Sequence, residues 1–454
     1  MSSSDFDLKK VKAEFNLKII ETEDLFSQVE PVEISNLLAE MLKQNVPIAL
    51  ANATEKASSD MKPLILDIFS GAGGFSLGFK WAGCQIIGAI EIDKWASETF
   101  AYNHPDAVVI NQDITTITNK DIAAIWDNNK PQIVIGGPPC QGYSICNKNS
   151  GDPKDPRNNL FRELIRVAIV FEPEILIMEN VPNLIKIRTH SQVKVIDIIE
   201  EEFKKIGYHV YINILEATAY GVPQIRKRLF IVASKQELEN PFPLPTHGVL
   251  TNQQMSLFGE NLKFCPTLWD AISDLPTLEA GEGKEESNYS KQPSNEYQKL
   301  LRNGNKILFN HKAMNHTKRM VERFATMTWG SSGKDVPKHL QPRQRNSTKI
   351  SQKIYDQNNR RLHPDKPCHT IPASFYANFV HPYQHRNFTA REGARIQSFP
   401  DSFKFMGKPT VVSHKLLSKE GRLAEKHLCQ YNQIGNAVPP LLAKAIADNI
   451  LKQL

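Results

Sequence analysis

The chain has 454 residues, of which 41% are hydrophobic and 23% charged, a composition typical of a globular protein with two or three domains. No apolar run approaches the roughly 18 residues that a membrane span needs, and the polar, acidic N-terminus does not resemble a signal peptide, so we expect a cytoplasmic protein. The six cysteines are scattered without Cys-x-x-Cys spacing, which argues against a zinc site or a disulfide framework and predicts free thiols.

The formal net charge of +6 is distributed unevenly along the chain. Residues 1–62 carry 7 Lys and Arg against 11 Asp and Glu, whereas residues 299–361 carry 15 against 3, a net charge of +12. Such an excess requires counter-ions, so we expect the basic segment to bind nucleic acid. The alternative is a solvated charged face.

The first 62 residues form an N-terminal extension whose role the sequence does not indicate. Val32–Leu42 has the apolar spacing of a helix, and Ala51–Met61 is small and polar like a linker. We therefore expect this extension to be separate from the domains that follow.

Strands and helices alternate from residue 63 onward, which predicts a parallel sheet covered by helices on both faces. The predicted strand Pro63–Phe69 is followed by a glycine-rich turn, Gly71–Gly74, and by an apolar helix start. The next predicted strand, Gln85–Ile90, ends at Glu91, 20 residues after Gly71. A carboxylate at this offset can accept hydrogen bonds from both ribose hydroxyls of a nucleoside cofactor.

A third predicted strand, Val108–Ile110, is followed by Asp113, whose carboxylate could accept a hydrogen bond from an adenine amino group. The alternative for Glu91 and Asp113 is that each caps a helix after its strand. The glycine turn is not followed by Gly-Lys-Ser or Gly-Lys-Thr, so we do not expect a Walker-type phosphate loop.

Cys140 is a candidate nucleophile because a predicted strand, Gln132–Ile135, stops at two glycines and two prolines directly before it. A single cysteine is more often a buried structural thiol, since only thiolates react. The stiff prolines and the polar stretch Cys146–Asn159 instead indicate a thiol presented under a loop that can close.

Glu179 follows the predicted strand Ile175–Met178 and is a candidate acid. A carboxylic acid at that position would face the same crevice as Cys140, where it could bind and protonate one small ring. The alternative is again a helix cap. Further on, the sequence Gln-x-Arg-x-Arg at Gln224–Arg228 is flanked by two predicted strands, Val210–Glu216 and Leu229–Val232.

The alternation of strands and helices is lost between about residues 233 and 430, where prolines, asparagines and basic residues are abundant. This change predicts a second domain inserted into the first. The chain then ends with a predicted apolar helix that starts at Pro439 and Pro440, residues well suited to a helix N-terminus.

Ordered segments of the chain resemble the motifs of the DNA (cytosine-5) methyltransferases of bacterial restriction-modification systems. Pro138–Ser144 resembles the catalytic motif of that family, Asp67–Ser76 its S-adenosylmethionine loop, and Gln224–Arg228 its cytosine-pocket motif. Arg360–Pro372 resembles the ninth motif, although Cys368-His369 replaces a commoner small residue and proline. Further resemblances lie at Glu91–Asp93, Asn111–Asp113, Asp155–Phe161, Glu179–Pro182, Arg391–Pro400 and Tyr431–Pro440.

The resemblance implies an α/β fold, namely the doubly wound, Rossmann-like sheet of S-adenosylmethionine-dependent methyltransferases with a smaller inserted target-recognition domain. The expected limits are an extension at 1–62, a catalytic domain at 63–242, a target-recognition domain at 243–426, and a C-terminal segment at 427–454 that returns to the catalytic domain.

The resemblance also implies the site residues. The catalytic set is Cys140, Glu179, Arg226 and Arg228, with no metal. The residues expected to contact S-adenosylmethionine are Phe69, Gly71, Gly73, Glu91, Ile92, Asp113, Ile114, Pro139, Leu160, Asn436 and Ala437.

The activity implied is transfer of the methyl group of S-adenosylmethionine to carbon 5 of a cytosine flipped out of a specific double-stranded DNA site, through a covalent cysteine adduct at carbon 6. We expect a monomer that protects host DNA from a cognate restriction endonuclease, a functional and not a physical partner. Two alternatives are a tRNA cytosine-5 methyltransferase of the same fold and a non-catalytic binding module that keeps the fold. The basic insert and Gln141–Ser144 argue against the first, and retention of Cys140 and Glu179 argues against the second.

We further expect residues 245–400 to select the DNA sequence. Some of their basic side chains should touch phosphates and others guanine edges. The candidates are Arg319, Arg323, Arg343, Arg345, Lys349 and Lys353.

Overall fold

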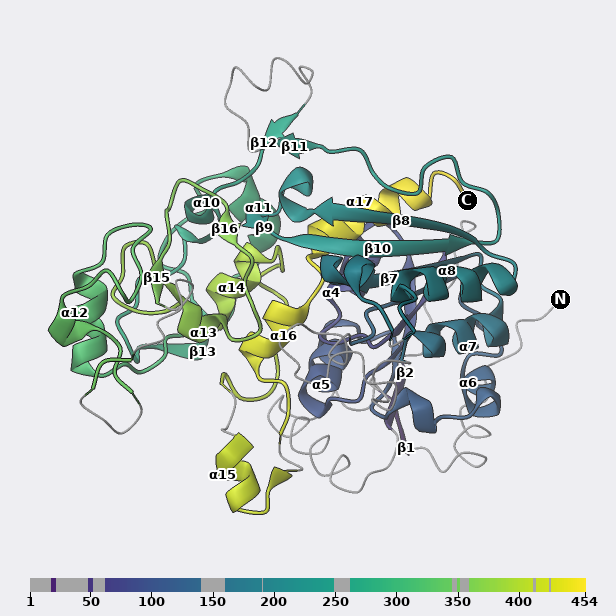
Figure 1. Ribbon diagram of the computed structural model, residues 1–454, viewed down its shortest axis with the longest axis horizontal. Coiled ribbons are helices and arrows are strands. Elements are labelled where there is room, and N and C mark those ends of the chain that lie inside the picture. The colour runs from purple at the N-terminus through teal and green to yellow at the C-terminus, as the bar shows by residue number, and fades with distance from the viewer. Residues whose placement is uncertain are drawn as a thin grey trace. The chain divides into compact units, whose positions relative to one another are not determined.

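The computed structural model describes residues 18–21, 48–51, 62–139, 160–189, 191–248, 262–344, 349–351, 359–410, 414–423 and 426–454 (Figure 1). The chain forms two compact units. Unit 1 comprises Met1–Leu215, Lys227–Leu244 and Ala443–Leu454, and unit 2 comprises Glu216–Arg226 and Pro245–Leu442. The domain limits expected from the sequence stay predictions.

Unit 1 is built on a seven-stranded sheet with the order β5-β4-β3-β6-β7-β10-β8. The strands are β3 (Leu64–Ile68), β4 (Gln85–Ile90), β5 (Val108–Ile110), β6 (Ile133–Gly136), β7 (Ile175–Asn180), β8 (His209–Glu216) and β10 (Lys227–Ser234). Strands β3 to β7 pair in parallel, so their carboxyl ends lie along one edge. The strand order reverses between β3 and β6, where open α/β sheets bind their ligands.

The sequence pattern predicted these strands because parallel strands buried on both faces are continuous apolar runs. The parallel sheet expected from the sequence is present from β3 to β7, and β10 extends it by pairing antiparallel with β7. The chain reaches β10 from β8 through a short connection, the 3-10 helix η5 (Ala217–Tyr220) and strand β9 (Gln224–Ile225), and not through a crossover helix.

The helices of unit 1 are α4 (Gly74–Trp81), α5 (Lys94–Asn103), α6 (Asn119–Ile125), α7 (Phe161–Phe171), α8 (Val195–Lys205) and α17 (Pro440–Ile450), whose first residues belong to unit 2. Apolar residues of α6, α7 and α8 share one core cluster with β3 to β7 and β10, and these helices lie together along the sheet in Figure 1. A small parallel pair, β1 (Lys18–Glu21) and β2 (Ile48–Ala51), belongs to the N-terminal extension. The helix expected at Val32–Leu42 lies outside the described residues.

Unit 2 consists of short strand pairs and short helices, as the loss of alternation predicted. Its pairs are β9 with β16 (Cys368–His369), β11 (His247–Gly248) with β12 (Lys263–Phe264), β13 (Gly283–Asn288) with β14 (Ile307–Lys312), and β15 (Arg360–Arg361) with β17 (Phe379–Val380). Its other helices are α10 (Leu268–Ile272), α11 (Glu296–Arg302), α12 (Lys318–Ala325), α13 (Phe375–Asn378), α14 (Ala390–Ile396), α15 (His414–Lys419) and α16 (Gln430–Asn436).

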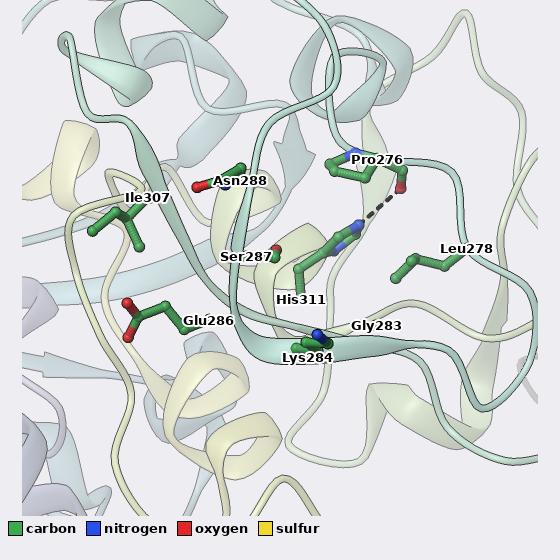
Figure 2. Close-up of a pocket in the computed structure, with 9 residues that line it drawn as sticks. All are labelled: Pro276, Leu278, Gly283, Lys284, Glu286, Ser287, Asn288, Ile307 and His311. Carbon is green, nitrogen blue, oxygen red and sulfur yellow. Dashed lines mark hydrogen bonds between the residues drawn. The ribbon is translucent and has the colours of Figure 1, made fainter. Parts of the chain in front are cut away.

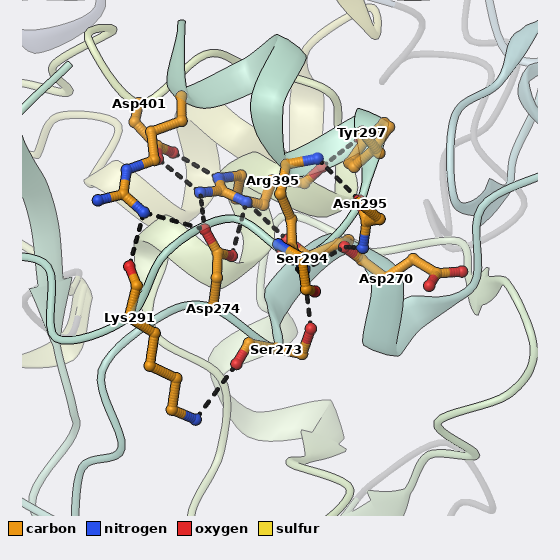
Figure 3. A network of polar contacts seen from close by, with 12 residues as sticks. Asp270, Ser273, Asp274, Lys291, Ser294, Asn295, Tyr297, Arg395 and Asp401 are labelled. Carbon is orange, nitrogen blue, oxygen red and sulfur yellow. Dashed lines mark hydrogen bonds and ion pairs between the residues drawn. The ribbon is translucent and has the colours of Figure 1, made fainter. Parts of the chain in front are cut away.

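Helix α14 is fully buried in unit 2 and is held by charged groups. Figure 3 shows Arg395 between two carboxylates, with Nε at 2.6 Å from Asp401 Oδ1 and Nη1 at 3.1 Å from Asp274 Oδ1. Burial alone would raise the pKa of Asp401, but the Arg395 guanidinium outweighs this effect and lowers it. Arg386 and Glu392 form a second buried pair at 2.7 Å. Buried charges persist only when paired, so these bridges tie α14 to its neighbours.

Candidate active site

The chain leaves β3 through a loop with three left-handed residues. Phe69, Gly71 and Gly73 have φ values of 58°, 55° and 89°. A side chain at Gly73 would place its Cβ 2.8 Å from Phe100 Cδ2 and 2.9 Å from His104 Nε2, so only glycine fits there. The space around Gly71 is open, with no atom within 4 Å of the corresponding Cβ position. The backbone of the loop is therefore accessible at Gly71.

Glu91 connects this loop to the next strand end. Its carboxylate accepts hydrogen bonds from the backbone N–H of Gly71 at 2.8 Å and of Asp93 at 2.7 Å. Burial raises the pKa of Glu91 to about 7, although both backbone hydrogen bonds oppose the rise. Helix α5 is capped by Asp93, which accepts from Ala96 N at 3.0 Å, so helix capping is not the role of Glu91.

Asp67 is a buried acid that the sequence interpretation did not select. Ser76 Oγ donates to Asp67 Oδ2 at 2.6 Å, and Asp67 is 1% exposed. Burial raises the pKa of Asp67 to about 8; Ser76 opposes this rise and the nearby Glu91 carboxylate adds to it. Asp67 and Ser76 are the two ends of the segment that resembles the S-adenosylmethionine loop, and a carboxyl group within an apolar strand was the signal that could have revealed Asp67.

The third strand end carries Asp113, which caps the 3-10 helix η1 (Ile114–Thr116). Its Oδ1 accepts hydrogen bonds from Thr115 N at 3.0 Å and Thr115 Oγ1 at 2.8 Å, as the capping alternative predicted. Ile114 is buried in the core, whereas Ile92 is 66% exposed. The side chain of Ile92 is therefore the more accessible of the two.

The ends of β6 and β7 bring Glu179 next to the residues that precede Cys140. The two strands are parallel, with Gly136 opposite Met178. Glu179 Oε2 lies 3.4 Å from the position that a Cβ on Gly137 would occupy, and Asn180 Nδ2 donates to Pro138 O at 3.2 Å. Cys140 lies outside the described residues, but the backbone leading to it, including the exposed Pro139, runs past Glu179.

Glu179 is paired with Arg228 across the antiparallel strands β7 and β10. Arg228 Nε lies 2.8 Å from Glu179 Oε1, and the two side chains are 15% and 12% exposed. Burial lowers the pKa of Arg228, while the Glu179 carboxylate counteracts this change. The structure thus joins two of the four predicted catalytic residues in one ion pair.

Arg226 lies two residues before Arg228 but has a different environment. It belongs to unit 2, is fully buried, and donates to three backbone carbonyl groups of that unit. Among the predicted cofactor residues, Asn436 is exposed at the end of α16, and Leu160 is half-buried at the start of α7. Their roles stay predictions.

Unit 2 also has a hollow of about 520 Å³ beside β13 (Figure 2). His311 lies on it, with Nε2 hydrogen-bonded to Pro276 O at 2.9 Å and Nδ1 to Thr389 Oγ1 at 3.0 Å. Burial lowers the pKa of His311 to about 4, so it is a neutral structural histidine. His311 is therefore not suited to acid–base chemistry at neutral pH.

Metal-binding clusters and membrane-spanning helices are both absent from the described part of the chain. Within it, no group of three or more His, Cys, Asp or Glu side chains could hold a metal ion. No helix of the described ranges is long and apolar enough to cross a membrane.

Known proteins resemble this chain over most of its length. The family described as C-5 cytosine-specific DNA methylase matches residues 64–452. The type II methyltransferase M.DdeI of Desulfomicrobium norvegicum is 46% identical over 390 residues, which cover 85% of this chain and 88% of that protein. M1.HphI of Haemophilus parahaemolyticus, also a type II methyltransferase, is 35% identical over 388 residues, covering 85% and 86%.

Solved structures show the same fold. A chain from E. coli, described as a DNA modification methyltransferase encoded within a prophage, aligns with a TM-score of 0.64 at 24% identity, covering 86% of this chain and 99% of that one. The Dnmt2 methyltransferase of S. pombe aligns with a TM-score of 0.51 at 17% identity, covering 86% and 99%.

The sheet and its helices are those of an α/β methyltransferase. The chain belongs to the C-5 cytosine-specific DNA methylase family. It is a DNA (cytosine-5) methyltransferase of the type II restriction-modification kind, which confirms the family, the fold class and the enzyme class expected from the sequence. The covalent cysteine mechanism, the flipped base and the protective role stay predictions. The same findings favour this enzyme over the tRNA and binding-module alternatives.

Proposed function

We propose that this enzyme methylates carbon 5 of a cytosine in a specific double-stranded DNA site, through a covalent bond between Cys140 and carbon 6. The observation that carries the proposal is the position of Glu179. Its carboxylate lies over Gly137, three residues before Cys140, and is held by Arg228 at 2.8 Å. A nucleophile and an acid at neighbouring strand ends are what addition to a pyrimidine ring requires.

The residues at the ends of β3, β4 and β5 fit S-adenosylmethionine, the methyl donor that the family implies. The open space at Gly71 admits the cofactor close to the backbone, and the exposed side chain of Ile92 suits one face of an adenine ring. The carboxylate of Glu91 lies at the loop, where it accepts hydrogen bonds from the ribose hydroxyls in this proposal. The other proposed contacts are Phe69, Gly73, Asp113, Ile114, Pro139, Leu160, Asn436 and Ala437. When bound, this cofactor supplies a methyl group on a positively charged sulfur.

Cys140 initiates the reaction in this proposal. Carbon 5 of cytosine is a poor nucleophile, so the Cys140 thiolate adds to carbon 6 and shifts an electron pair towards carbon 5. Carbon 5 then forms the new bond to the methyl carbon while the bond between that carbon and the positively charged sulfur breaks, and the electron pair of the broken bond stays on the sulfur. Loss of the carbon 5 proton returns its electron pair to the ring, and the bond between sulfur and carbon 6 breaks, releasing the thiolate.

Glu179 and Arg228 stabilise the ring during the addition. Negative charge develops towards N3 and the exocyclic amine, where Glu179 forms a hydrogen bond and shares a proton. Arg228 holds the carboxylate of Glu179 at 2.8 Å and orients it, and its remaining donors are suited to the O2 edge. Because a duplex hides both faces of the base, the cytosine is flipped out at a cost of a few kcal/mol.

We propose that the basic segment of unit 2 binds DNA. Two of the six candidate side chains for DNA contacts are engaged within the protein. Arg319 donates to the carbonyls of His339 and Gln341, and the buried Arg323 donates to Leu340 O at 2.6 Å. Both arginines stabilise the turn that contains the 3-10 helix η6 (Lys338–Leu340).

The exposed candidates within the described residues are Arg343 and Lys349, and we propose these for phosphate or base contacts. Arg345 and Lys353 lie outside the described residues. In this proposal, residues 245–400 select the DNA sequence.

We also propose a biological role and an assembly state. The enzyme acts as a monomer in the cytoplasm and protects host DNA from a cognate restriction endonuclease. The type II methyltransferases that it resembles support this role.

Two linked experiments test the function. Bisulfite sequencing of DNA from cells that express the wild type should reveal one methylated site, which the Cys140→Ser variant should leave unmodified. A duplex with 5-fluorocytosine at that site should trap the wild type covalently, because fluorine cannot leave as a proton does. The serine variant should bind S-adenosylmethionine normally and form no adduct. An adduct with the serine variant would show that Cys140 is not the nucleophile.

A further inference from the structure

Asn180, the last residue of β7, is hydrogen-bonded to the segment of unit 1 that leads to Cys140. Its Nδ2 donates to Pro138 O at 3.2 Å, and its Oδ1 accepts from Val181 N at 2.7 Å. A backbone carbonyl can only accept and a backbone N–H can only donate, so the two contacts fix the orientation of the amide. Asn180 is buried, with 5% exposure, and both ends of its side chain are satisfied.

This contact lies just beyond the last pair of the parallel ladder between β6 and β7. Strand β6 ends at Gly136, opposite Met178 of β7. The chain then continues along β7, because the position of a Cβ on Gly137 lies 3.4 Å from Glu179 Oε2. The hydrogen bond to Asn180 follows one residue later on each segment.

The two prolines explain why a side chain makes this contact. Pro138 and Pro139 have no backbone N–H, so neither can donate to a continued ladder. The amide of Asn180 supplies a hydrogen bond at the point where those donors are missing. Only Pro139 separates the bonded carbonyl from Cys140, and its ring fixes φ near −65°. A fixed Pro138 carbonyl therefore restricts the direction in which the chain continues.

We propose that Asn180 is a positioning residue that fixes the backbone before Cys140 relative to Glu179 and thereby sets the rate of the addition step. This inference rests on the proposed function, in which Cys140 is the nucleophile and Glu179 the acid. In that step the bond between sulfur and carbon 6 forms, and the π electron pair between carbons 5 and 6 moves towards carbon 5. Asn180 itself touches no reacting atom in this proposal.

Both reacting groups are then referred to one strand end. Glu179 is held from one side by Arg228 at 2.8 Å, and the next residue, Asn180, holds the backbone before the thiol. A misplacement of about 1 Å between reacting groups can slow a reaction about 10²-fold. Loss of the contact to Pro138 should therefore slow the addition without changing which ligands bind.

Two substitutions remove the contact without adding charge. Asn180→Ala deletes the amide, and Asn180→Leu replaces it with a branched apolar side chain of similar shape. The matched control is Asn449→Ala. Asn449 lies on α17 in unit 1, and its Nδ2 donates to the backbone carbonyl of Asn240 at 2.9 Å. The control thus removes the same kind of hydrogen bond at a place with no proposed role in the reaction.

The test measures single-turnover adduct formation by the full-length protein with a 5-fluorocytosine duplex, at saturating DNA and S-adenosylmethionine. The affinities for both ligands are measured separately. Both Asn180 variants should form the adduct about 10- to 100-fold more slowly, with both affinities within about threefold of wild type. Asn449→Ala should keep the rate constant within about threefold of wild type. The amplitude reports the folded fraction, so a purely structural role of Asn180 would lower the amplitude and leave the rate constant unchanged.

Thermal melting checks that each variant is folded, and Asn180→Leu decides the question if Asn180→Ala does not fold. A wild-type rate constant in a folded Asn180 variant, or a loss confined to amplitude or affinity, would overturn the inference. Equal slowing by Asn449→Ala would overturn it as well, because the effect would then be general destabilisation. A wild type that forms no adduct would instead refute the proposed function.

Discussion

Replacing Glu179 with glutamine is the most direct test of the proposed site. The change keeps the shape of the side chain and removes the ability to share a proton, so turnover should fall by roughly 10² to 10⁴, as is typical when a general acid is lost. It also removes the charge opposite Arg228, 2.8 Å away. Breaking a fully buried ion pair lowers the free energy of unfolding by about 3 to 5 kcal/mol. Because Arg228 and Glu179 are 15% and 12% exposed and the amide oxygen of glutamine still accepts a hydrogen bond, we expect a loss of about 1 to 3 kcal/mol.

The assay is single-turnover transfer of a labelled methyl group to a duplex, together with cofactor affinity and thermal unfolding. The control variant is Glu202→Gln, which breaks an ion pair of the same length, 2.8 Å, between Glu202 and Arg162 on the helical side of unit 1. Glu202→Gln should leave turnover unchanged. If Glu179→Gln retains turnover within about threefold of wild type while losing stability, Glu179 is only the structural partner of Arg228 and the proposed chemistry is wrong.

Three further predictions concern other parts of the molecule. Gly73→Ala should destabilise unit 1 in denaturant unfolding by more than Gly83→Ala, because both residues have positive φ but only Gly73 would place its Cβ within 3 Å of neighbouring side chains; equal losses would contradict this. Thermal stability should fall as pH rises from about 4 to 8, because Asp67 and Glu91, with pKa values raised to about 8 and 7, keep protons in the folded state that the unfolded chain has released. Asp67→Asn should flatten that profile. Lys349→Gln should lower the slope of log affinity for DNA against log salt by about 0.9 if it removes one phosphate contact, and an unchanged slope would place the contact elsewhere.

The sequence alone was sufficient for the strands of the seven-stranded sheet and for the residues at their ends. Continuous apolar runs interrupted by glycine and proline are local signals, and each predicted strand from Pro63 to Val232 lies within about two residues of an observed strand at both ends. Because parallel strands end at one edge of the sheet, the pattern of strands by itself places Glu91, Asp113 and Glu179 at that edge.

The direction of β10 and the roles of polar side chains depended on tertiary structure. Glu91 and Asp113 occupy equivalent places after their strands, yet Glu91 holds the glycine loop while Asp113 caps a 3-10 helix. Nothing in the local sequence distinguishes them, because the difference depends on which backbone N–H groups the fold brings near.

The two arginines of Gln-x-Arg-x-Arg show this limit most clearly. Arg228 pairs with Glu179, whereas Arg226 is buried against carbonyls that are 145 to 211 residues away in the sequence. The local motif identifies both arginines as candidate site residues. Their partners are set by long-range packing, about which a local pattern has no information. The same reason applies to Arg319 and Arg323. The excess of positive charge in their segment made them candidates for DNA contacts, whereas in the structure they donate to backbone carbonyls and stabilise a turn.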